Sequence, residues 1–245
     1  MERWIGKTAV VTGASAGIGA AICVALASAD INVVGLARRP ALIDELHSKV
    51  SGNGVIKSLK CDVSVPEQVA ASFKWISEHV GCVHIIVNNA GVMIKGHITD
   101  ASGHIMTEAD LLATIDTNFK GPVMCTRHAI HSMITHDVEG HIININSISG
   151  HYVPFTSTFN VYPSTKHAIT AFTAGLLNEV AEHKNKIKVT SLSPGLVNTD
   201  MAYGHEDMPS LRAEDVADTL LYVLSTPPSV NINEITITAV TEKRL

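Results

Sequence analysis

Short runs of β-branched and apolar residues alternate with segments of helical periodicity along the whole chain. The runs fall at 7–13, 31–38, 54–63, 83–91, 141–147, 187–195 and 234–240. Their nearly continuous apolar character is typical of parallel strands covered on both faces. Between them, a helical period predicts helices over 18–29, 41–50, 67–80, 111–135, 164–183 and 213–225. This alternation predicts a doubly wound α/β fold, with a seven-stranded, mostly parallel sheet and helices on both faces.

The domain organisation follows from the length and from the absence of linkers in the sequence. A chain of 245 residues fits one large α/β domain, and no Pro-, Gly- or Ser-rich linker, repeat or low-complexity tract interrupts it. We therefore expect residues 1–245 to form a single domain. Gly121-Pro122 lies inside one helical pattern, and a break or bend is expected there.

Composition narrows the classes of partner. The net charge of -5 does not favour nucleic-acid or anionic-membrane binding, and no apolar run is long enough to span a bilayer. The four cysteines lie far apart in apolar segments, which predicts buried free thiols in a reducing compartment. Neither these cysteines nor His128 and His131 have the partners of a metal site. We expect a cytoplasmic protein without metal.

A glycine-rich turn, TGASAGIG, links the first predicted strand to the first predicted helix. Gly13, Gly17 and Gly19 allow a tight turn and a close approach to a diphosphate, and the helix start offers free N–H groups. The spacing is GxxxGxG rather than the commoner GxGxxG. Its place between strand and helix nevertheless predicts a dinucleotide site.

The end of the second strand indicates which dinucleotide. An acidic residue there would bind the adenosine ribose hydroxyls and favour NAD, but the chain reads Ala37-Arg38-Arg39. The guanidinium groups of Arg38 and Arg39 suit a 2′-phosphate. The alternative is a pair of solvated loop arginines. The sequence favours NADP.

Tyr162 and Lys166 stand four residues apart in NVYPSTKHA, with Pro163 between them. Proline is tolerated in the first turn of a helix, so Tyr162 is expected at a helix start with Lys166 on the same face one turn later. The alternative is a boundary tyrosine beside a solvated lysine. The pair alone does not decide between them. If the two act together, the lysine charge one helical turn away favours the phenolate, and they form an acid–base unit.

With these features in view, the chain resembles the short-chain dehydrogenase/reductase family from Gly6 to about Val240. The resemblance rests on TGASAGIG, Cys61-Asp62-Val63, the NNAG ending at Gly91, TNFKG, INSISG, the Tyr162–Lys166 pair and PGLVNT from Pro194. Seven ordered motifs are far more specific than any one of them. The phrases RWIGKTAVVTGAS, GHIININSISGH and EDVADTLLYVLSTP are most similar to the insect farnesol dehydrogenase-like branch, which is related to cytosolic 3- and 17-ketosteroid reductases.

The resemblance implies a set of site residues. A catalytic tetrad would be formed by Asn118, Ser147, Tyr162 and Lys166. The cofactor would be bound by Gly13, Ser15, Gly17, Ile18, Gly19, Arg38, Arg39, Asp62, Val63, Asn89, Ala90, Gly91, Tyr162, Lys166, Pro194, Gly195, Val197 and Thr199. In these roles Ser147 would orient the substrate oxygen, and Asn118 would anchor a water connected to Lys166.

One spacing departs from the family pattern. Ser147 lies fifteen residues before Tyr162, whereas thirteen is the commoner spacing, which Ser149 would satisfy. Ser147 is preferred because it stands three residues before Gly150, as the SxxG pattern requires.

The expected activity is NADP-dependent interconversion of an alcohol and its aldehyde or ketone on a hydrophobic substrate, with a farnesol-like isoprenoid alcohol favoured. A 3- or 17-ketosteroid or broad-specificity carbonyl reductase, and a non-catalytic dinucleotide sensor, remain alternatives. Relatives pair through helices that here span 118–135 and 164–183, so a homodimer or homotetramer is expected. A short substrate lid over 200–212 predicts an open, permissive site, unless a partner's C-terminal tail closes it.

Overall fold

The computed structural model describes all residues except 100–102, 104, 155–157, 183–185, 203–206 and 244–245. Its centre is one sheet of seven parallel strands in the order β3-β2-β1-β4-β5-β6-β7. The strands are β1 (Thr8–Thr12), β2 (Asn32–Ala37), β3 (Ile56–Lys60), β4 (Ile85–Asn88), β5 (Gly140–Ile145), β6 (Ile187–Pro194) and β7 (Glu234–Ile237). Each coincides with a segment predicted as a strand, apart from Gly140, which starts β5 one residue early, and this confirms the doubly wound fold.

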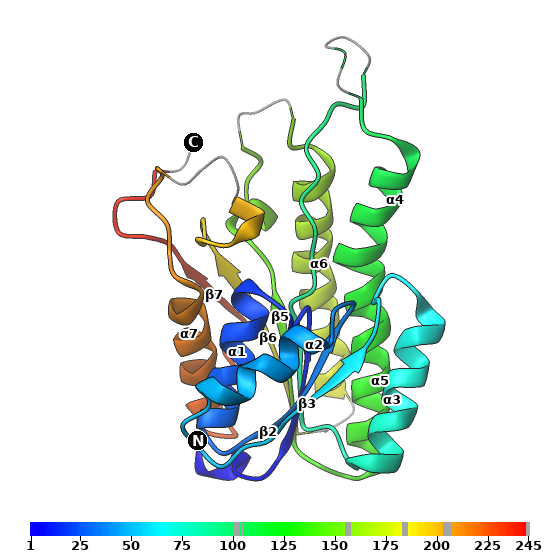
Figure 1. Ribbon diagram of the computed structural model, residues 1–245, viewed down its shortest axis with the longest axis vertical. Helices are drawn as coiled ribbons and strands as arrows, with labels where there is room; N and C mark the ends of the chain where they lie inside the picture. Colours follow the sequence, from blue (N-terminus) through cyan, green and yellow to red (C-terminus); the bar gives the residue numbers. More distant parts are fainter. Residues whose placement is uncertain (100–102, 104, 155–157, 183–185, 203–206, 244–245) are drawn as a thin grey trace.

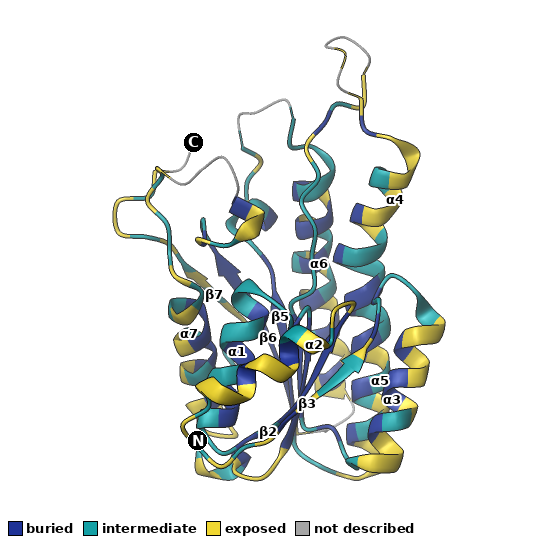
Figure 2. Cartoon of the chain, viewed as in Figure 1, coloured by how far each residue is buried: buried dark blue, intermediate teal, exposed yellow. Residues whose placement is uncertain are grey.

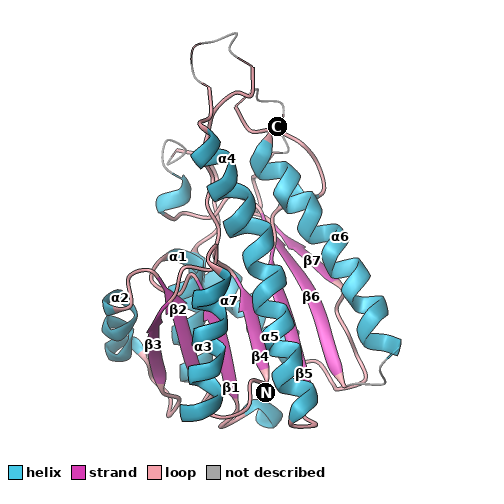
Figure 3. Ribbon diagram, turned by 90° about the vertical axis from the view of Figure 1, so that its right-hand side faces the viewer, coloured by secondary structure: helices cyan, strands magenta, loops and turns pink. Residues whose placement is uncertain are grey.

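Helices cover both faces of the sheet (Figures 1 and 3). One face carries α1 (Gly17–Ser28), the short α2 (Ala41–Asp44) and α7 (Ala213–Ser225). The other carries α3 (Pro66–His79), α5 (Gly121–Thr135) and α6 (Val161–Glu182), with α4 (Glu108–Ile115) continuing upward from α5. The predicted helix over 41–50 is α-helical only in α2, because the chain tightens into the 3₁₀ turn η2 (Glu45–Lys49).

The core consists of two apolar layers, one on each face of the sheet. Leu26, Ile85 and Leu220 belong to the layer under α1 and α7, whereas Val69, Met133 and Val189 belong to the layer under α3, α5 and α6. In Figure 2 the strands are buried along most of their length, while the outer surfaces of the helices are exposed. Burial on both faces explains why the strands read as continuous apolar runs.

The break predicted at Gly121-Pro122 begins one turn earlier. Residues Asp116–Lys120 (η4) form a π-helical turn, after which α5 starts at Gly121. Pro122 has no N–H for the carbonyl group of Asn118, four residues before it, and the wider turn accommodates that loss. Gly121 also faces Val63 closely, since a Cβ at this position would lie 2.9 Å from the Val63 Cγ2. The start of α5 thus packs against Val63, which lies just after the end of β3.

The strand order reverses between β1 and β4, which pair with each other at the centre of the sheet. The crossovers from these two strands lead to opposite faces, so the loops that follow them diverge and leave a crevice. Ligands of open α/β sheets bind at such switch points. The fold therefore favours a ligand site at the loops after β1, β4 and β5.

Candidate active site

A cavity of about 310 Å³ opens at this switch point. Its lining comes from the turn after β1, from the ends of β2 to β5, from the start of α6 and from the segment after β6. Of the residues predicted to bind a cofactor, the lining includes Gly13, Ser15, Gly17, Ile18, Arg38, Arg39, Asp62, Val63, Asn89, Ala90, Gly91, Tyr162, Lys166 and Thr199. Residues far apart in sequence thus meet where the resemblance implies that they should.

The glycine-rich turn is held by side chains from its own strand and from β4. The Thr12 hydroxyl accepts the N–H groups of Asn89 and Ala90, both at 3.0 Å, and the Asn89 amide donates to the Thr12 carbonyl at 2.9 Å. A Cβ at Gly19 would overlap the carbonyl oxygen of Gly13. Glycine is therefore required where α1 crosses the turn.

The start of α1 leaves its first N–H groups facing the cavity. Its N-cap residue, Ala16, has no side chain that could accept these hydrogen bonds, and Gly17 takes a φ of 51°. A Cβ at Gly17 would come within 3.0 Å of the Thr199 side chain. This uncapped helix start provides N–H donors and a positive dipole end for an anion.

Two cations line the same cavity. Arg38 and Arg39 follow β2, are exposed and line the cavity together with Asp62 and Val63. Asp62 is itself fixed in its turn, because its carboxylate accepts the Ser64 N–H at 3.0 Å and the Ser64 hydroxyl at 2.6 Å. Backbone donors and guanidinium groups in one cavity are the chemistry that a dinucleotide with phosphate groups requires.

Tyr162 and Lys166 lie in the first turns of α6, which begins at Val161 with Pro163 inside its first turn, as predicted. The Lys166 ammonium donates to the Ile145 carbonyl at 2.9 Å and lies 5.7 Å from the centre of the Tyr162 ring. Burial lowers the pKa of Lys166 to about 8. Lys166 is only 6% exposed, so it is not the solvated lysine of the alternative interpretation.

The sequence predicts that the Lys166 charge lowers the pKa of Tyr162, but in the structure this pKa is raised. Burial raises the pKa of Tyr162, and a hydrogen bond with the Ser147 side chain lowers it only in part. Desolvation disfavours the phenolate, and the Lys166 ammonium is directed at a carbonyl rather than at the phenol oxygen. Tyr162 is therefore a neutral phenol at neutral pH.

Ser147, rather than Ser149, reaches Tyr162. Its hydroxyl accepts the Ser149 N–H at 3.1 Å, which makes it the cap of the 3₁₀ turn η5 (Ile148–Gly150). A Cβ at Gly150 would lie 2.7 Å from the Asn146 amide and 2.9 Å from the Lys166 carbonyl. This close approach explains the glycine of the SxxG pattern.

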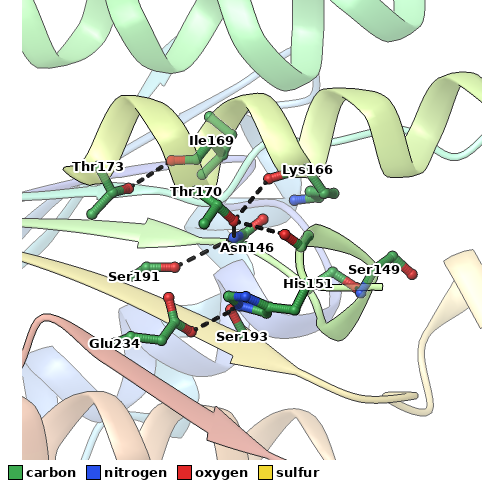
Figure 4. A network of polar contacts seen from close by, with 12 residues as sticks. Asn146, Ser149, His151, Lys166, Ile169, Thr170, Thr173, Ser191, Ser193 and Glu234 are labelled. Atoms are coloured by element: carbon green, nitrogen blue, oxygen red, sulfur yellow. Dashed lines mark hydrogen bonds and ion pairs between the residues drawn. The ribbon is translucent and has the colours of Figure 1, made fainter. Parts of the chain in front are cut away.

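Side chains on both sides of η5 tie it to the sheet and to α6 (Figure 4). The Thr170 hydroxyl donates to the Gly150 carbonyl at 3.0 Å, and the Asn146 amide donates to Thr170 at 2.8 Å. On the other side, the His151 ring lies 3.0 Å from the Ser193 hydroxyl and 3.3 Å from the Glu234 carboxylate. The turn η5, which Ser147 caps, is thus held by side-chain contacts on both sides.

Asn118 lies behind the cavity rather than in its lining, and it is 2% exposed. Its amide accepts the Val92 N–H and donates to the Val92 carbonyl, both at 2.8 Å, and donates to the Thr165 hydroxyl at 3.2 Å. Thr165 donates in turn to the Tyr162 carbonyl at 2.7 Å. The Asn118 side chain therefore links the π-helical turn, the segment after β4 and the start of α6.

Other predicted residues lie outside the cavity lining. Ser147 is one, and Gly19, Pro194, Gly195 and Val197 are the remaining ones. Gly19 packs against the glycine-rich turn, Pro194 ends β6 and Val197 is buried. Ser147 contacts the site through its hydrogen bond with Tyr162, and the other four lie in the same motifs as residues that line the cavity.

Sequence reasoning missed several residues of the site. Thr12 and Thr117 are two of them, and Asn146 is a third, with a buried Oδ1 that has no hydrogen-bond partner among the described residues. All three lie within quoted motifs, TGASAGIG, TNFKG and INSISG, so the sequence did mark their positions. The predicted lid over 200–212 includes 203–206, which lie outside the described residues; of its remainder, Asp200 and Met201 line the cavity.

Comparison with known proteins supports the fold and identifies the family. The family described as short chain dehydrogenase matches residues 7–209. The chain is 43% identical over 253 residues to a farnesol dehydrogenase of Aedes aegypti, covering 99% of this chain and 100% of that one. It is 40% identical over 252 residues to dehydrogenase/reductase SDR family member 11 of Mus musculus, covering 96% and 95% of the two chains.

A solved structure gives the same answer. The closed form of a serine dehydrogenase complexed with NADP+ superposes with a TM-score of 0.84 at 28% identity, covering 96% of each chain. The family match spans most of the chain, and the relatives align along nearly all of it. The chain therefore belongs to the short-chain dehydrogenase family.

Proposed function

We propose that this protein is an NADP-dependent oxidoreductase that interconverts an alcohol and its aldehyde or ketone on a hydrophobic substrate. The observation that carries the proposal is the meeting of Ser147, Tyr162 and Lys166 beside a cavity that also holds an uncapped helix start and two arginines. Bound NADPH supplies the hydride, and the protein supplies orientation and the proton.

The chain's own residues account for cofactor binding. The N–H groups at the start of α1 bind the diphosphate, and Arg38 and Arg39 bind the 2′-phosphate. Asp62 and Val63 flank the adenine, Asn89 to Gly91 line the middle of the site, and the segment from Pro194 to Thr199 holds the nicotinamide end. The NADP+ bound to the structurally similar serine dehydrogenase supports the choice of this dinucleotide.

Tyr162 transfers the proton. As a neutral phenol it is ready to donate to the oxygen of a carbonyl substrate, and Ser147 holds that oxygen in place by a hydrogen bond. Lys166, whose ammonium lies beside the Tyr162 ring, binds the nicotinamide ribose. Pro122 has no N–H to donate to the carbonyl group of Asn118. That carbonyl anchors a water that connects Lys166 to solvent.

A farnesol-like isoprenoid alcohol, or the aldehyde derived from it, is the favoured substrate. The farnesol dehydrogenase of Aedes aegypti, 43% identical to this chain, supports this choice. Because the lid predicted over 200–212 is short, we expect an open site, in which several hydrophobic alcohols or ketones of medium length are turned over with weak discrimination. Steroid ketones are the second class to test.

The proposal extends to the organisation of the protein. Residues 1–245 act as one dinucleotide-binding domain, which works in the cytoplasm as a homodimer or homotetramer. Exposed apolar side chains on α4, Leu112 and Ile115, add to the apolar surface available for pairing. Among the described residues, no helix combines the length and the apolar character needed to cross a bilayer.

A substrate screen tests the proposal. Purified protein is mixed with NADP+ and farnesol, geraniol or a hydroxysteroid, or with NADPH and the matching carbonyls and small quinones, and cofactor absorbance is followed. Turnover of isoprenoid alcohols with NADP+ is the expected result. Faster turnover of steroids would replace the substrate assignment alone. Binding of NADPH without turnover of any substrate would favour a non-catalytic dinucleotide sensor.

A further inference from the structure

The C-terminal tail folds back onto the segment that follows β6. Glu242 lies in a turn in which its own N–H donates to the Ala239 carbonyl at 2.9 Å. Its carboxylate accepts two backbone N–H groups, from Leu196 at 2.9 Å and from Ala239 at 3.2 Å. One side chain thus joins the chain after β7 to the chain after β6.

Gly195 makes room for this contact. If a Cβ is built at Gly195, its three nearest heavy atoms all belong to the Glu242 carboxyl group, and they overlap it. A side chain at this position would push the carboxylate away from the Leu196 N–H. The glycine of the PGLVNT motif is therefore matched to a residue near the end of the chain.

The contact occurs where the chain turns from the sheet toward the cavity. The Gly195 N–H still pairs with the Ile237 carbonyl of β7 at 2.8 Å, and the Leu196 carbonyl accepts the Leu211 N–H at 2.8 Å. Three residues after Leu196, Thr199 lines the cavity. Glu242 holds Leu196, which links the end of β6 to the cavity lining, and Glu242 itself lies outside that lining.

A carboxylate holds this link more firmly than a neutral acceptor would. Hydrogen bonds to an ionised acceptor are roughly twice as strong as those between neutral groups. Two N–H groups from different segments share the carboxylate, so its loss would release both of them. Leu196 would then be held on its carbonyl side only.

We propose that Glu242 is a positioning residue, whose carboxylate keeps the segment from Gly195 to Thr199 in the shape that binds the nicotinamide half of the cofactor. This inference rests on the proposed function, in which that segment holds the nicotinamide end.

Two ligands separate the halves of the cofactor site. NADP+ contacts both halves, whereas adenosine 2′,5′-bisphosphate contacts only the adenine half. Their dissociation constants are measured by calorimetry for wild type, Glu242→Ala, Glu242→Gln and the adjacent exposed control Lys243→Ala. Thermal unfolding of each variant is recorded in parallel.

Glu242→Ala should weaken NADP+ binding about tenfold, which is the lower end of the effect of one hydrogen bond to a charged group. Its affinity for the bisphosphate should stay within about twofold of wild type. Glu242→Gln keeps an acceptor oxygen for one of the two N–H groups and should fall between, while Lys243→Ala should match wild type. Across these variants, kcat should decrease in the same order as the affinity for NADP+.

A second variant covers the case in which changes to the tail destabilise the protein. Gly195→Ala alone should also weaken NADP+ binding about tenfold and leave the bisphosphate unaffected. In the Glu242→Ala background the same change should have little further effect, because the carboxylate that it displaces is gone. Additive effects would show that the two residues act independently and would overturn the inference.

Other outcomes are equally decisive. Equal losses of affinity for both ligands would mean that Glu242 supports the fold as a whole, and the positioning role would be wrong. Unchanged NADP+ binding in Glu242→Ala would overturn it too. Wild-type protein that binds neither ligand would overturn the proposed function, and the inference with it.

Discussion

Acid should destabilise the protein through one buried histidine in β5. His141 has no exposed surface; its Nε2 lies 2.8 Å from the Thr190 hydroxyl, and its Nδ1 has no hydrogen-bond partner among the described residues. Burial lowers the pKa of His141 from 6.5 to about 3, and the nearby cations Lys188 and Arg3 add to that shift. The folded protein thus keeps this imidazole neutral.

The size of the effect follows from the two pKa values. The unfolded chain takes up a proton near pH 6.5 that the folded chain accepts only near pH 3. The stability associated with the neutral ring is therefore complete above pH 6.5 and is lost as the pH falls toward 3. Between pH 7.5 and pH 5, this residue should lower the free energy of unfolding by about 2 kcal/mol.

His141→Gln isolates this contribution. Glutamine can place a polar atom near the position of Nε2, keep the contact with Thr190 and carry no titratable group. Urea unfolding of wild type and variant at pH 7.5, 6.5, 5.5 and 5.0 gives the difference in free energy at each pH. The variant should be less stable than wild type at pH 7.5 because of imperfect packing, and that gap should shrink by about 2 kcal/mol at pH 5.

The matched control is His131→Gln on the exposed surface of α5. Water solvates a protonated ring there, so this change should leave the pH dependence of wild type in place. A gap between wild type and His141→Gln that stays constant from pH 7.5 to pH 5 would refute the argument from burial.

Two further predictions concern the cofactor and the assembly. Replacing Arg38 and Arg39 with Ala should erode an NADP preference of at least about tenfold in kcat/KM, mainly by weakening NADP; a wild type that prefers NAD would contradict the assignment. Light scattering at micromolar concentration should give the mass of a dimer or tetramer, because α4 and α5 carry exposed apolar side chains that can pair; a monomeric mass would exclude that assembly.

The regular part of the fold was predictable because its signals are local. Alternating periodicity located every strand of the sheet, and Pro163 located the start of α6. The start of α4 was missed by three residues, although Thr107 and Asp110 form a capping box that carries a sequence signal. The π-helical turn before Gly121 was less accessible, since the wider turn depends on packing against Val63 as well as on Pro122.

The candidate site was predictable where a motif places side chains in the cavity, and less so behind it. Spacing alone left Ser147 and Ser149 as alternatives, and the bond to Tyr162 favours Ser147. The raised pKa of Tyr162 was not foreseen, because desolvation depends on the complete fold. Glu242 was missed for a similar reason, since a contact across 46 residues of sequence leaves no local pattern.

The most direct test of the account is the turnover of Tyr162→Phe. The variant keeps the ring and loses only the hydroxyl that transfers the proton, so it should bind NADPH with nearly wild-type affinity in a fluorescence titration. Its turnover of the best substrate from the screen should be abolished, because no proton can reach the carbonyl oxygen from this position. Near-normal turnover with intact NADPH binding would contradict the central claim that Tyr162 is the acid–base group.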